Sequence, residues 1–131
     1  MKLSFASAYA LRALVHLAKS KENASRPSHV IAAAEGIPDR FLLKVLQRLV
    51  WARVLHGLKG QRGGYRLARP ADCITLLQVI EAVDGPLQGT VPEVARGKLD
   101  ELLQEICDGA AELVRQRLRK VTVHDLAAKG K

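Results

Sequence analysis

The sequence, 131 residues long, has little cysteine, few aromatic side chains and no long apolar run. Two cysteines are too few for a disulfide framework, and the first residues lack the basic flank and apolar core of a secretory signal. Charged residues interrupt every apolar stretch, so a membrane-spanning helix is excluded and a cytoplasmic protein is expected. Aromatic residues make up 4% of the chain, and alanine and leucine dominate its apolar residues, which favours packed helices over a β-sandwich.

What is present is typical of one globular domain with an appended element. Hydrophobic residues make up 48% and charged residues 26% of the chain. The net charge of +8 is concentrated at one end, because residues 1–70 hold 13 Lys and Arg against three acids and residues 71–131 carry a net charge of −2. This asymmetry indicates a polyanionic partner for the first half, either nucleic acid or an anionic membrane surface, unless the charge only solvates the surface.

The spacing of apolar residues predicts a helix-turn-helix in the first half of the chain. A scaffold helix over residues 7–20 precedes a short helix, capped by Ser28, that stops at Gly36. Asp39 is then expected to cap a longer, amphipathic helix over residues 39–52. Four polar side chains share the face opposite its apolar stripe: Arg40, Lys44, Gln47 and Arg48. Two such helices joined by a tight turn with glycine are typical of a helix-turn-helix.

The glycine-rich segment after this helix predicts a β-hairpin over residues 57–67, because glycines at positions 60, 63 and 64 lie between short apolar runs. Its tip is expected to carry polar, mostly basic side chains: Lys59, Gln61, Arg62 and Arg66. A phosphate-binding loop of an NTPase would need Lys-Ser or Lys-Thr after its glycines, and neither pair follows here. We therefore interpret the segment as a basic wing, with Trp51 as a hinge between helix and wing rather than as a base-stacking platform.

Two capping boxes mark the helices of the second half. Thr75 with Gln78 starts a helix that ends at Gly85, and Thr122 with Asp125 starts a short last helix. A connector and a long amphipathic helix lie between them. The expected organisation is a winged helix-turn-helix DNA-binding domain, a connector, and a dimerisation helix with a short C-terminal helix: residues 1–86, 87–98 and 99–131.

The long helix carries an apolar stripe that is broad for so small a protein. Eight residues form it: Leu99, Leu102, Leu103, Ile106, Ala110, Leu113, Val114 and Leu118. The expected partner for this stripe is the same helix of a second copy, which would give a two-fold dimer. The alternative is that the helix folds back on its own domain.

Five segments of the chain match the pattern of a known protein family: MKLSFASAYALRALVHLA, GIPDRFLLKVLQRLVWARVL, GQRGGYRLARP, ITLLQVIEAVDG and VTVHDLAA. Through them the chain resembles the Rrf2 family of bacterial winged-helix regulators. That family includes the iron-sulfur cluster regulator, the nitric-oxide-sensitive repressor and the cysteine-metabolism repressor. The likeness covers residues 1–85 and resumes over residues 99–128, and its most specific part is GGYRLARP followed by ITLL.

The resemblance implies a mainly helical fold with a small β-hairpin, namely a winged helix-turn-helix domain plus a long dimerisation helix. It implies a homodimeric, sequence-specific regulator, usually a repressor, that reads a pseudo-palindromic operator in double-stranded DNA. The helix at 39–52 would enter the major groove and the wing at 57–67 the minor groove, where Arg and Lys donate to base edges and phosphates. The candidate DNA-binding residues are Arg40, Phe41, Lys44, Arg48, Lys59, Gln61, Arg62 and Arg66.

Cluster-binding members of the family have three cysteines before the dimerisation helix, whereas residues 85–106 here contain none. We therefore expect no iron-sulfur cluster and no other cofactor. Both Cys73 and Cys107 are interpreted as small buried hydrophobic residues, with Cys107 kept as the candidate redox residue. The four histidines are scattered and form no zinc pattern, so no metal site is expected.

No catalytic constellation stands out in the sequence, and an enzyme is not expected. Two alternatives to a DNA-binding regulator stay open at this point. One is a winged-helix module that binds a protein partner and has no DNA site of its own. The other is a cluster or redox sensor with atypical ligands such as Glu93, Glu101 and Cys107. The sequence does not identify the signal, which could be a small effector between the domains, a partner protein or thiol oxidation.

Overall fold

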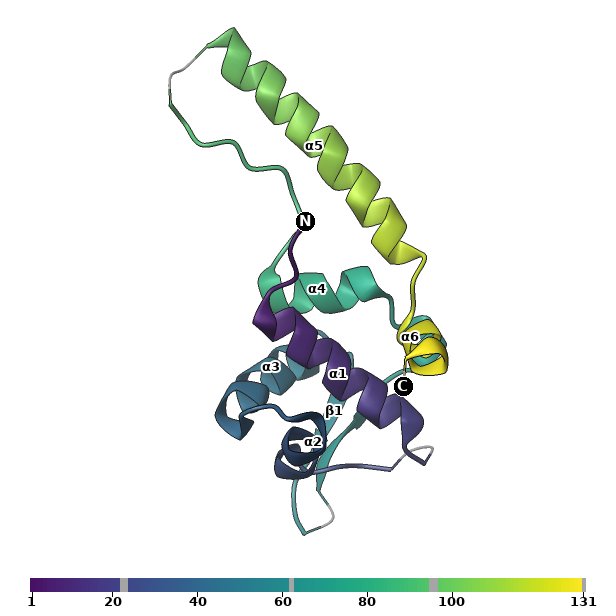
Figure 1. The fold of residues 1–131 in the computed structure, drawn as a ribbon. Coiled ribbons are helices and arrows are strands. Elements are labelled where there is room, and N and C mark those ends of the chain that lie inside the picture. The colour runs from purple at the N-terminus through teal and green to yellow at the C-terminus, as the bar shows by residue number, and fades with distance from the viewer. Residues whose placement is uncertain (22–23, 62, 95–96, 131) are drawn as a thin grey trace.

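The computed structural model describes residues 1–21, 24–61, 63–94 and 97–130 (Figure 1). The elements, in chain order, are α1 (Phe5–Lys19), α2 (Ser28–Glu35), α3 (Asp39–Trp51), β1 (Leu55–Leu58), β2 (Gly64–Leu67), the 3-10 turn η1 (Ala71–Cys73), α4 (Leu76–Asp84), α5 (Lys98–Arg119) and α6 (Val123–Lys129). The two strands form one antiparallel hairpin. This confirms the predicted fold class, a mainly helical winged helix-turn-helix with a long additional helix.

Helix α1 forms the centre of the core. It packs against α2, α3, α4 and α6, and its inward face consists of small and branched residues that are buried, among them Ala10, Ala13 and Leu14. The alanines let the neighbouring helices approach closely, and α3 contributes Leu42 and Leu46, both fully buried. Each buried leucine of this kind stabilises the fold by roughly 2 kcal/mol. The outward faces of α1 and α3 are thereby left free for other roles.

The helix starts follow the predictions only in part. Both capping boxes are confirmed; in the first, the Thr75 hydroxyl accepts from the Gln78 amide at 3.1 Å and the Gln78 side chain accepts from the Thr75 amide at 2.9 Å. The caps predicted at Ser28 and Asp39 are wrong, because prolines occupy the N-cap positions of α2 and α3. A proline before each helix adopts extended geometry, so Ser28 and Asp39 already lie in the first turn, where neither accepts a capping hydrogen bond.

The last helix, α6, returns to the N-terminal core after the long helix α5. The Leu76 amide donates to the Val121 carbonyl at 2.8 Å, and the Val123 amide donates to the Ile74 carbonyl at 2.9 Å. The Val123 side chain is fully buried and belongs to the same core cluster as Leu14. The C-terminal end of α5 is therefore attached to the winged domain through α6.

The start of α1 is tied to the end of α4 by a hydroxyl-carboxylate cluster. The Ser7 side chain is fully buried, and its hydroxyl donates to Asp84 Oδ2 at 2.7 Å. The Ser4 hydroxyl, which also caps α1, donates to the same carboxylate. The cluster satisfies a buried polar group and fixes α4, from which the connector to α5 departs.

Candidate nucleic-acid interface

Helix α3 presents a polar stripe to solvent along its outer face. Arg40, Lys44 and Gln47 are exposed and follow one another at i, i+4 and i+7, which places them on one side of the helix. The opposite side is the buried face, so the stripe cannot turn inward. Two of the predicted basic residues of this helix, Arg40 and Lys44, thus lie together, and Gln47 joins them. The same spacing in the sequence would have included Gln47 among the candidate site residues.

Arg48, also a predicted DNA-binding residue, lies toward the flank of this stripe. Its side chain has a partner within the chain, since Nη1 donates to the Val83 carbonyl at 2.5 Å. This contact joins the last turn of α3 to the end of α4 and satisfies a helix C-terminal carbonyl. In this structure Arg48 fixes α3 to the core.

Large apolar side chains are exposed on α3 as well. Phe41 is 55% exposed and Trp51 is 72% exposed. Trp51 continues the outward stripe at i+11 from Arg40, so it does not pack between helix and wing as a hinge at this place would. The reason is that Val54 and Leu55, which are buried, fill the space between helix and wing. Trp51 is consequently free to contact whatever the stripe contacts.

The hairpin follows α3 and packs against it through β1. Its register pairs Leu55 with Leu67 and Leu58 with Gly64, so the tip spans residues 59–63. Lys59 and Gln61 are exposed at this tip. The placement of Arg66 at the tip is wrong, because Arg66 lies within β2, where it pairs with His56 of β1 and is half-buried. Arg62, predicted to lie at the tip, falls outside the described residues. In Figure 1 the hairpin tip and α2 lie at the end of the molecule opposite α5.

The return strand of the hairpin lies directly against the chain before α2. The Arg26 amide donates to the Tyr65 carbonyl at 2.9 Å, and the Tyr65 amide donates to the Arg26 carbonyl at 2.8 Å. Gly64, with φ of +134°, makes this approach possible, because a Cβ at this position would overlap the Arg26 carbonyl group. Strand β2 is thus fastened, next to the hairpin tip, to the segment between α1 and α2.

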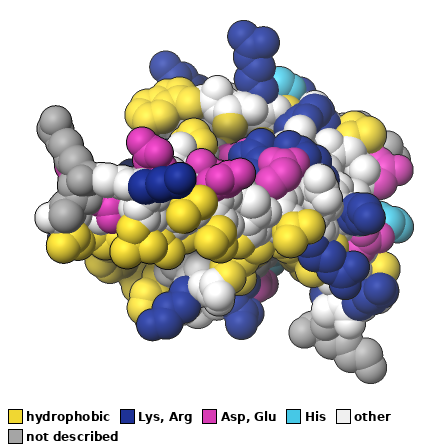
Figure 2. All heavy atoms as spheres, turned by 90° about the horizontal axis from the view of Figure 1, so that it is seen from above, with side chains coloured by type: hydrophobic (Ala, Val, Ile, Leu, Met, Phe, Trp, Pro, Cys, Tyr) yellow, Lys and Arg dark blue, Asp and Glu magenta, His cyan; other side chains and the backbone are white. Residues whose placement is uncertain are grey.

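Helix α5 projects from the rest of the chain and has no buried residue, although all of its residues are described (Figure 1). Figure 2 looks down on the end that carries α5 and shows a band of hydrophobic side chains beside acidic and basic ones. Exposed apolar residues recur along α5 at alternating spacings of four and three: Leu99, Leu103, Ile106, Ala110 and Leu113. Ile106 is 66% and Leu113 69% exposed. Leu102 is exposed next to them, and we call these six residues the open face of α5.

The other side of α5 is half-buried. Val114 and Leu118, both predicted to belong to the dimer stripe, lie on this side together with Cys107. The connector runs along it, because the Gln104 side-chain amide donates to the Gly89 carbonyl at 2.8 Å, and Gly89 lies directly against the backbone of Cys107. The helix therefore divides its apolar residues between its own chain and solvent.

An ion pair joins the C-terminal half of α5 to α4. The Arg115 guanidinium contacts the Glu81 carboxylate, which also accepts from the Leu87 amide at 2.8 Å. Both charged side chains are about one-quarter exposed. The pair fixes the C-terminal half of α5 relative to the winged domain.

A comparison with known protein families agrees with this architecture. The profile of the Rrf2 family, described as iron-dependent transcriptional regulators, matches residues 3–129. The chain belongs to the Rrf2 family. Members of this family are transcriptional regulators, so the chain is a DNA-binding regulator of the winged helix-turn-helix type and not an enzyme.

Relatives in sequence carry the same description. A chain of Mycobacterium tuberculosis (strain H37Rv), named as an HTH-type transcriptional regulator, is 33% identical over 132 aligned positions, which cover 97% of this chain and 81% of the relative. The HTH-type transcriptional regulator IscR of Cereibacter sphaeroides is 33% identical over 86 positions, covering 64% of this chain and 56% of IscR. The stronger likeness to the first of these extends through α5 and α6.

Solved structures of Rrf2 regulators share the fold. CymR, the global cysteine regulator of Bacillus subtilis, superposes with a TM-score of 0.82 at 24% identity and covers 100% of this chain and 99% of CymR. IscR of T. potens superposes with a TM-score of 0.77 at 20% identity, covering 100% of this chain and 89% of IscR. Both likenesses extend over the winged domain and the long helix together.

The family's description as iron-dependent raises the question of whether this chain's residues fit iron. Among residues 1–21, 24–61, 63–94 and 97–130, no three His, Cys, Asp or Glu side chains lie close enough to hold a metal ion. The two thiols lie on separate elements, Cys73 in η1 and Cys107 in α5. Iron-sulfur clusters rely mainly on several cysteine thiolates. The described residues of a single chain therefore do not fit an iron site.

The two cysteines differ from their expected burial. Cys107 is half-buried, but Cys73 is exposed, so its interpretation as a buried hydrophobic residue is wrong. The reason is that η1 turns Cys73 outward just before Ile74, which enters the core fully buried. A hydrogen bond from the Cys73 thiol to Asp72 raises the pKa of that thiol.

Within the part of the chain that the structure describes, no helix has the length and apolar character needed to cross a membrane.

Proposed function

We propose that this Rrf2 regulator is a homodimeric repressor that reads a pseudo-palindromic operator, with α3 in the major groove and the wing in the minor groove. The observation that carries the proposal is the exposed stripe of Arg40, Lys44 and Gln47 on α3, beside a wing with Lys59 and Gln61 at its tip. The major groove of B-DNA admits one α-helix, and a row of exposed polar side chains along that helix can then reach the edges of the bases.

The chemistry of the stripe suits both kinds of DNA contact. Arg40 and Lys44 donate hydrogen bonds of the kind that guanine O6 and N7 accept, and Gln47 carries the amide that pairs with adenine in the major groove. Phe41 supplies apolar surface for a thymine methyl group. Lys59 and Gln61 at the wing tip, with the predicted Arg62, suit phosphates and the narrow minor groove.

The open face of α5 supports the dimer. Its spacing of four and three residues is the repeat by which two helices pack along a common seam. An exposed apolar face of this length is an unfavourable surface for a single chain in water, and a second copy offers the same face in a two-fold arrangement. Such a dimer would present two α3 helices to half-sites about 34 Å apart, or a multiple of that distance. The repressor role rests on the resemblance to the family alone.

The first experiment is capture of genomic DNA. Purified, reduced protein is incubated with sheared DNA from its own genome at about 0.15 M salt, where non-specific binding is weak, and the retained DNA is sequenced. We expect a shared two-fold motif. Transcription in vitro from a promoter that contains the motif is then expected to fall when protein is added. Capture of nothing above background, with capture of a protein from the same cells, would contradict the proposal.

Two variants separate base reading from phosphate contact on the recovered motif. Lys59→Ala is expected to weaken binding to every sequence alike and to lower the slope of log affinity against log salt by about 1. Lys44→Ala is expected in addition to relax the base preference at one position of each half-site. Lys98→Ala is the matched control, since it removes the same charge from the start of α5. Binding that is equal for all three variants would exclude the proposed placement of α3 and the wing.

We also propose that the regulator works without an iron-sulfur cluster. The absence of cysteine from residues 85–106 supports this, as does the separation of Cys73 from Cys107. Anaerobically purified protein is expected to be colourless and free of iron. Visible absorption that disappears on exposure to air would contradict it.

A further inference from the structure

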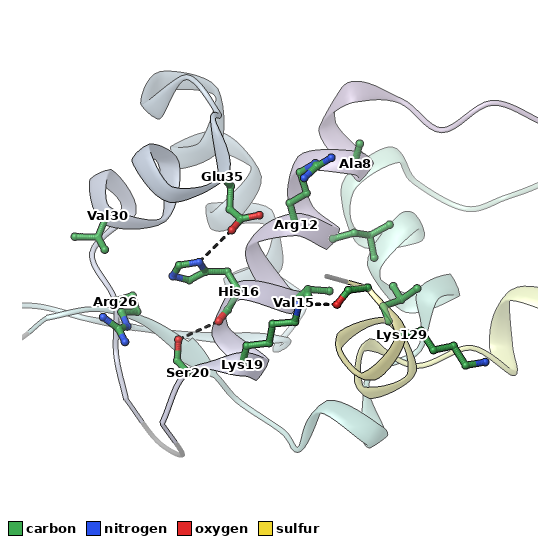
Figure 3. Close-up of a pocket in the computed structure, with 13 residues that line it drawn as sticks. Ala8, Arg12, Val15, His16, Lys19, Ser20, Arg26, Val30, Glu35 and Lys129 are labelled. Carbon is green, nitrogen blue, oxygen red and sulfur yellow. Dashed lines mark hydrogen bonds and ion pairs between the residues drawn. The ribbon is translucent and has the colours of Figure 1, made fainter.

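A groove of about 870 Å³ lies between α1, α2 and α6 (Figure 3). Its described lining residues come from these helices and the segments next to them, and none belongs to α3, the hairpin or α5. The groove is therefore separate from both surfaces used in the proposed function. Its volume lies within the range of small-molecule sites in proteins, roughly 300–1,000 Å³.

One side of the groove is apolar. Leu11 and Val15 of α1, Val30 of α2 and Leu126 of α6 line it, and each is half-buried. Leu11 and Val15 also pack against the core, and all four side chains have remaining apolar surface at the groove. A ligand that covered this surface would gain from removing it from water.

The rest of the lining is dominated by positive charge. Arg12, Lys19, Arg26 and Lys129 line the groove, whereas Glu35 is the carboxylate among its described lining residues. Glu35 is already engaged, because its Oε2 lies 3.2 Å from His16 Nδ1, as the dashed line in Figure 3 marks. Four cations against one occupied carboxylate leave an excess of positive charge around the apolar side.

One of these cations also has an unused donor. The Arg26 Nε is buried and has no hydrogen-bond partner among the described residues. A buried donor without a partner is unfavourable, and native structures normally supply an acceptor for it. The Arg26 backbone pairs with Tyr65, so this side chain starts from a fixed point beside the groove.

We propose that this groove binds a small organic anion with an apolar body. The apolar body would lie against Leu11, Val15 and Leu126, and the anionic group, a carboxylate, sulfonate or phosphate, would accept hydrogen bonds from Arg26 and the neighbouring cations. Apolar surface together with a few placed charges is the usual make-up of a small-molecule site.

The groove lies between the DNA-binding half of the chain and α6, so a ligand bound there would contact both parts. Helices α1 and α2 belong to the DNA-binding half, while α6 follows directly from the end of α5. The two sides are joined across the groove by the Lys19 ammonium group, which donates to the Gly130 carbonyl at 2.7 Å. A ligand seated between them would change the relation of α5 to the winged domain if it favoured one separation over another.

Fluorescence titration with 1-anilinonaphthalene-8-sulfonate, an aromatic sulfonate, tests the site on the full chain without DNA. N-phenyl-1-naphthylamine, which has the same rings and no charge, is the comparison probe. We expect saturable binding of one sulfonate probe per chain, and binding of the neutral probe that is at least about tenfold weaker. Equal affinity for the two probes would overturn the proposal, since the cations would then have no role.

Two variants assign the binding to this groove. Arg26→Gln and Lys129→Gln are each expected to weaken the sulfonate probe about tenfold. Lys129 is exposed, so its replacement keeps the test valid if Arg26→Gln fails to fold. Arg40→Gln on α3 is the control, expected to leave probe binding unchanged and to weaken capture of DNA. The proposal is wrong if both groove variants bind the probe normally, or if Arg26→Gln weakens only DNA binding, which would make Arg26 a phosphate contact.

Discussion

At the scale of single residues, Gly64 shows most directly how the wing depends on the backbone. A Cβ at this position would lie 2.6 Å from the Pro27 nitrogen and closer still to the Arg26 carbonyl group, and its φ of +134° is one that other residues rarely adopt. Gly64→Ala is expected to lower the free energy of unfolding by about 2–4 kcal/mol, measured by urea denaturation. Gly60→Ala is the control, because Gly60 has a positive φ but open space, and about 1–2 kcal/mol is expected there. Equal losses would mean that the contact with Arg26 is unimportant.

The reactivity of the Cys73 thiol is controlled mainly by one neighbour, Asp72. Its Sγ lies 3.5 Å from Asp72 Oδ1, and this hydrogen bond, then desolvation and the carboxylate charge, raise the pKa of the thiol from its ordinary value of 9.0, although Arg69 opposes the shift. Since the thiolate is the reactive form, Cys73 is expected to react slowly at pH 8. Asp72→Ala should lower this pKa and speed alkylation by iodoacetamide roughly threefold. Mass spectrometry of the Cys73 peptide measures the rate, and the Cys107 peptide should be unaffected.

At the scale of elements, the capping box of α6 links helix formation to pH. The Thr122 amide donates to Asp125 Oδ2 at 2.9 Å, and this bond, together with that of the Thr122 side chain, holds the pKa of Asp125 below its ordinary value of 3.8. The ionised carboxylate therefore stabilises the fold above about pH 4, and this contribution is lost as the pH falls through the lowered pKa. The stability difference between the parent and Asp125→Ala should narrow from pH 6 to pH 3 in urea titrations. A difference that stayed constant over this range would rule out the linkage.

The elements also show what the sequence can and cannot predict. Apolar spacing and the Thr-Gln and Thr-Asp pairs located the helices, and glycine spacing located the hairpin, because these signals act within a few residues. The exposure of Trp51 and the partner of Arg48 depend on Leu55 and Val83, which come from other elements, and were not predicted. The return of α6 to the core and the groove beside it were missed for the same reason. Which of the predicted residues touch DNA stays a prediction.

At the scale of the whole molecule, the open face of α5 makes the assembly state the decisive property. Ile106→Glu places a charge in the middle of this face and is expected to convert a dimer into monomers in sedimentation velocity measurements, and to weaken operator binding at least about tenfold, since two half-sites are no longer bound together. Gln116→Glu adds the same charge to an exposed position outside the face and should leave the dimer intact. If Ile106→Glu sediments like the parent chain, the open face is not the seam.

Because α6 packs against the N-terminal core, the two parts of the chain are expected to stay associated after the connector is cut. Val123 is buried in the core where α6 packs against α1, and Arg115 pairs with Glu81 of α4, so the C-terminal third is held by more than its covalent link. A chain cleaved once near Thr90, which is exposed in the connector, should therefore remain a single particle in native gel filtration. When the two fragments are expressed separately and mixed, they are expected to associate and to restore operator binding. The regulator could then be used as a split protein.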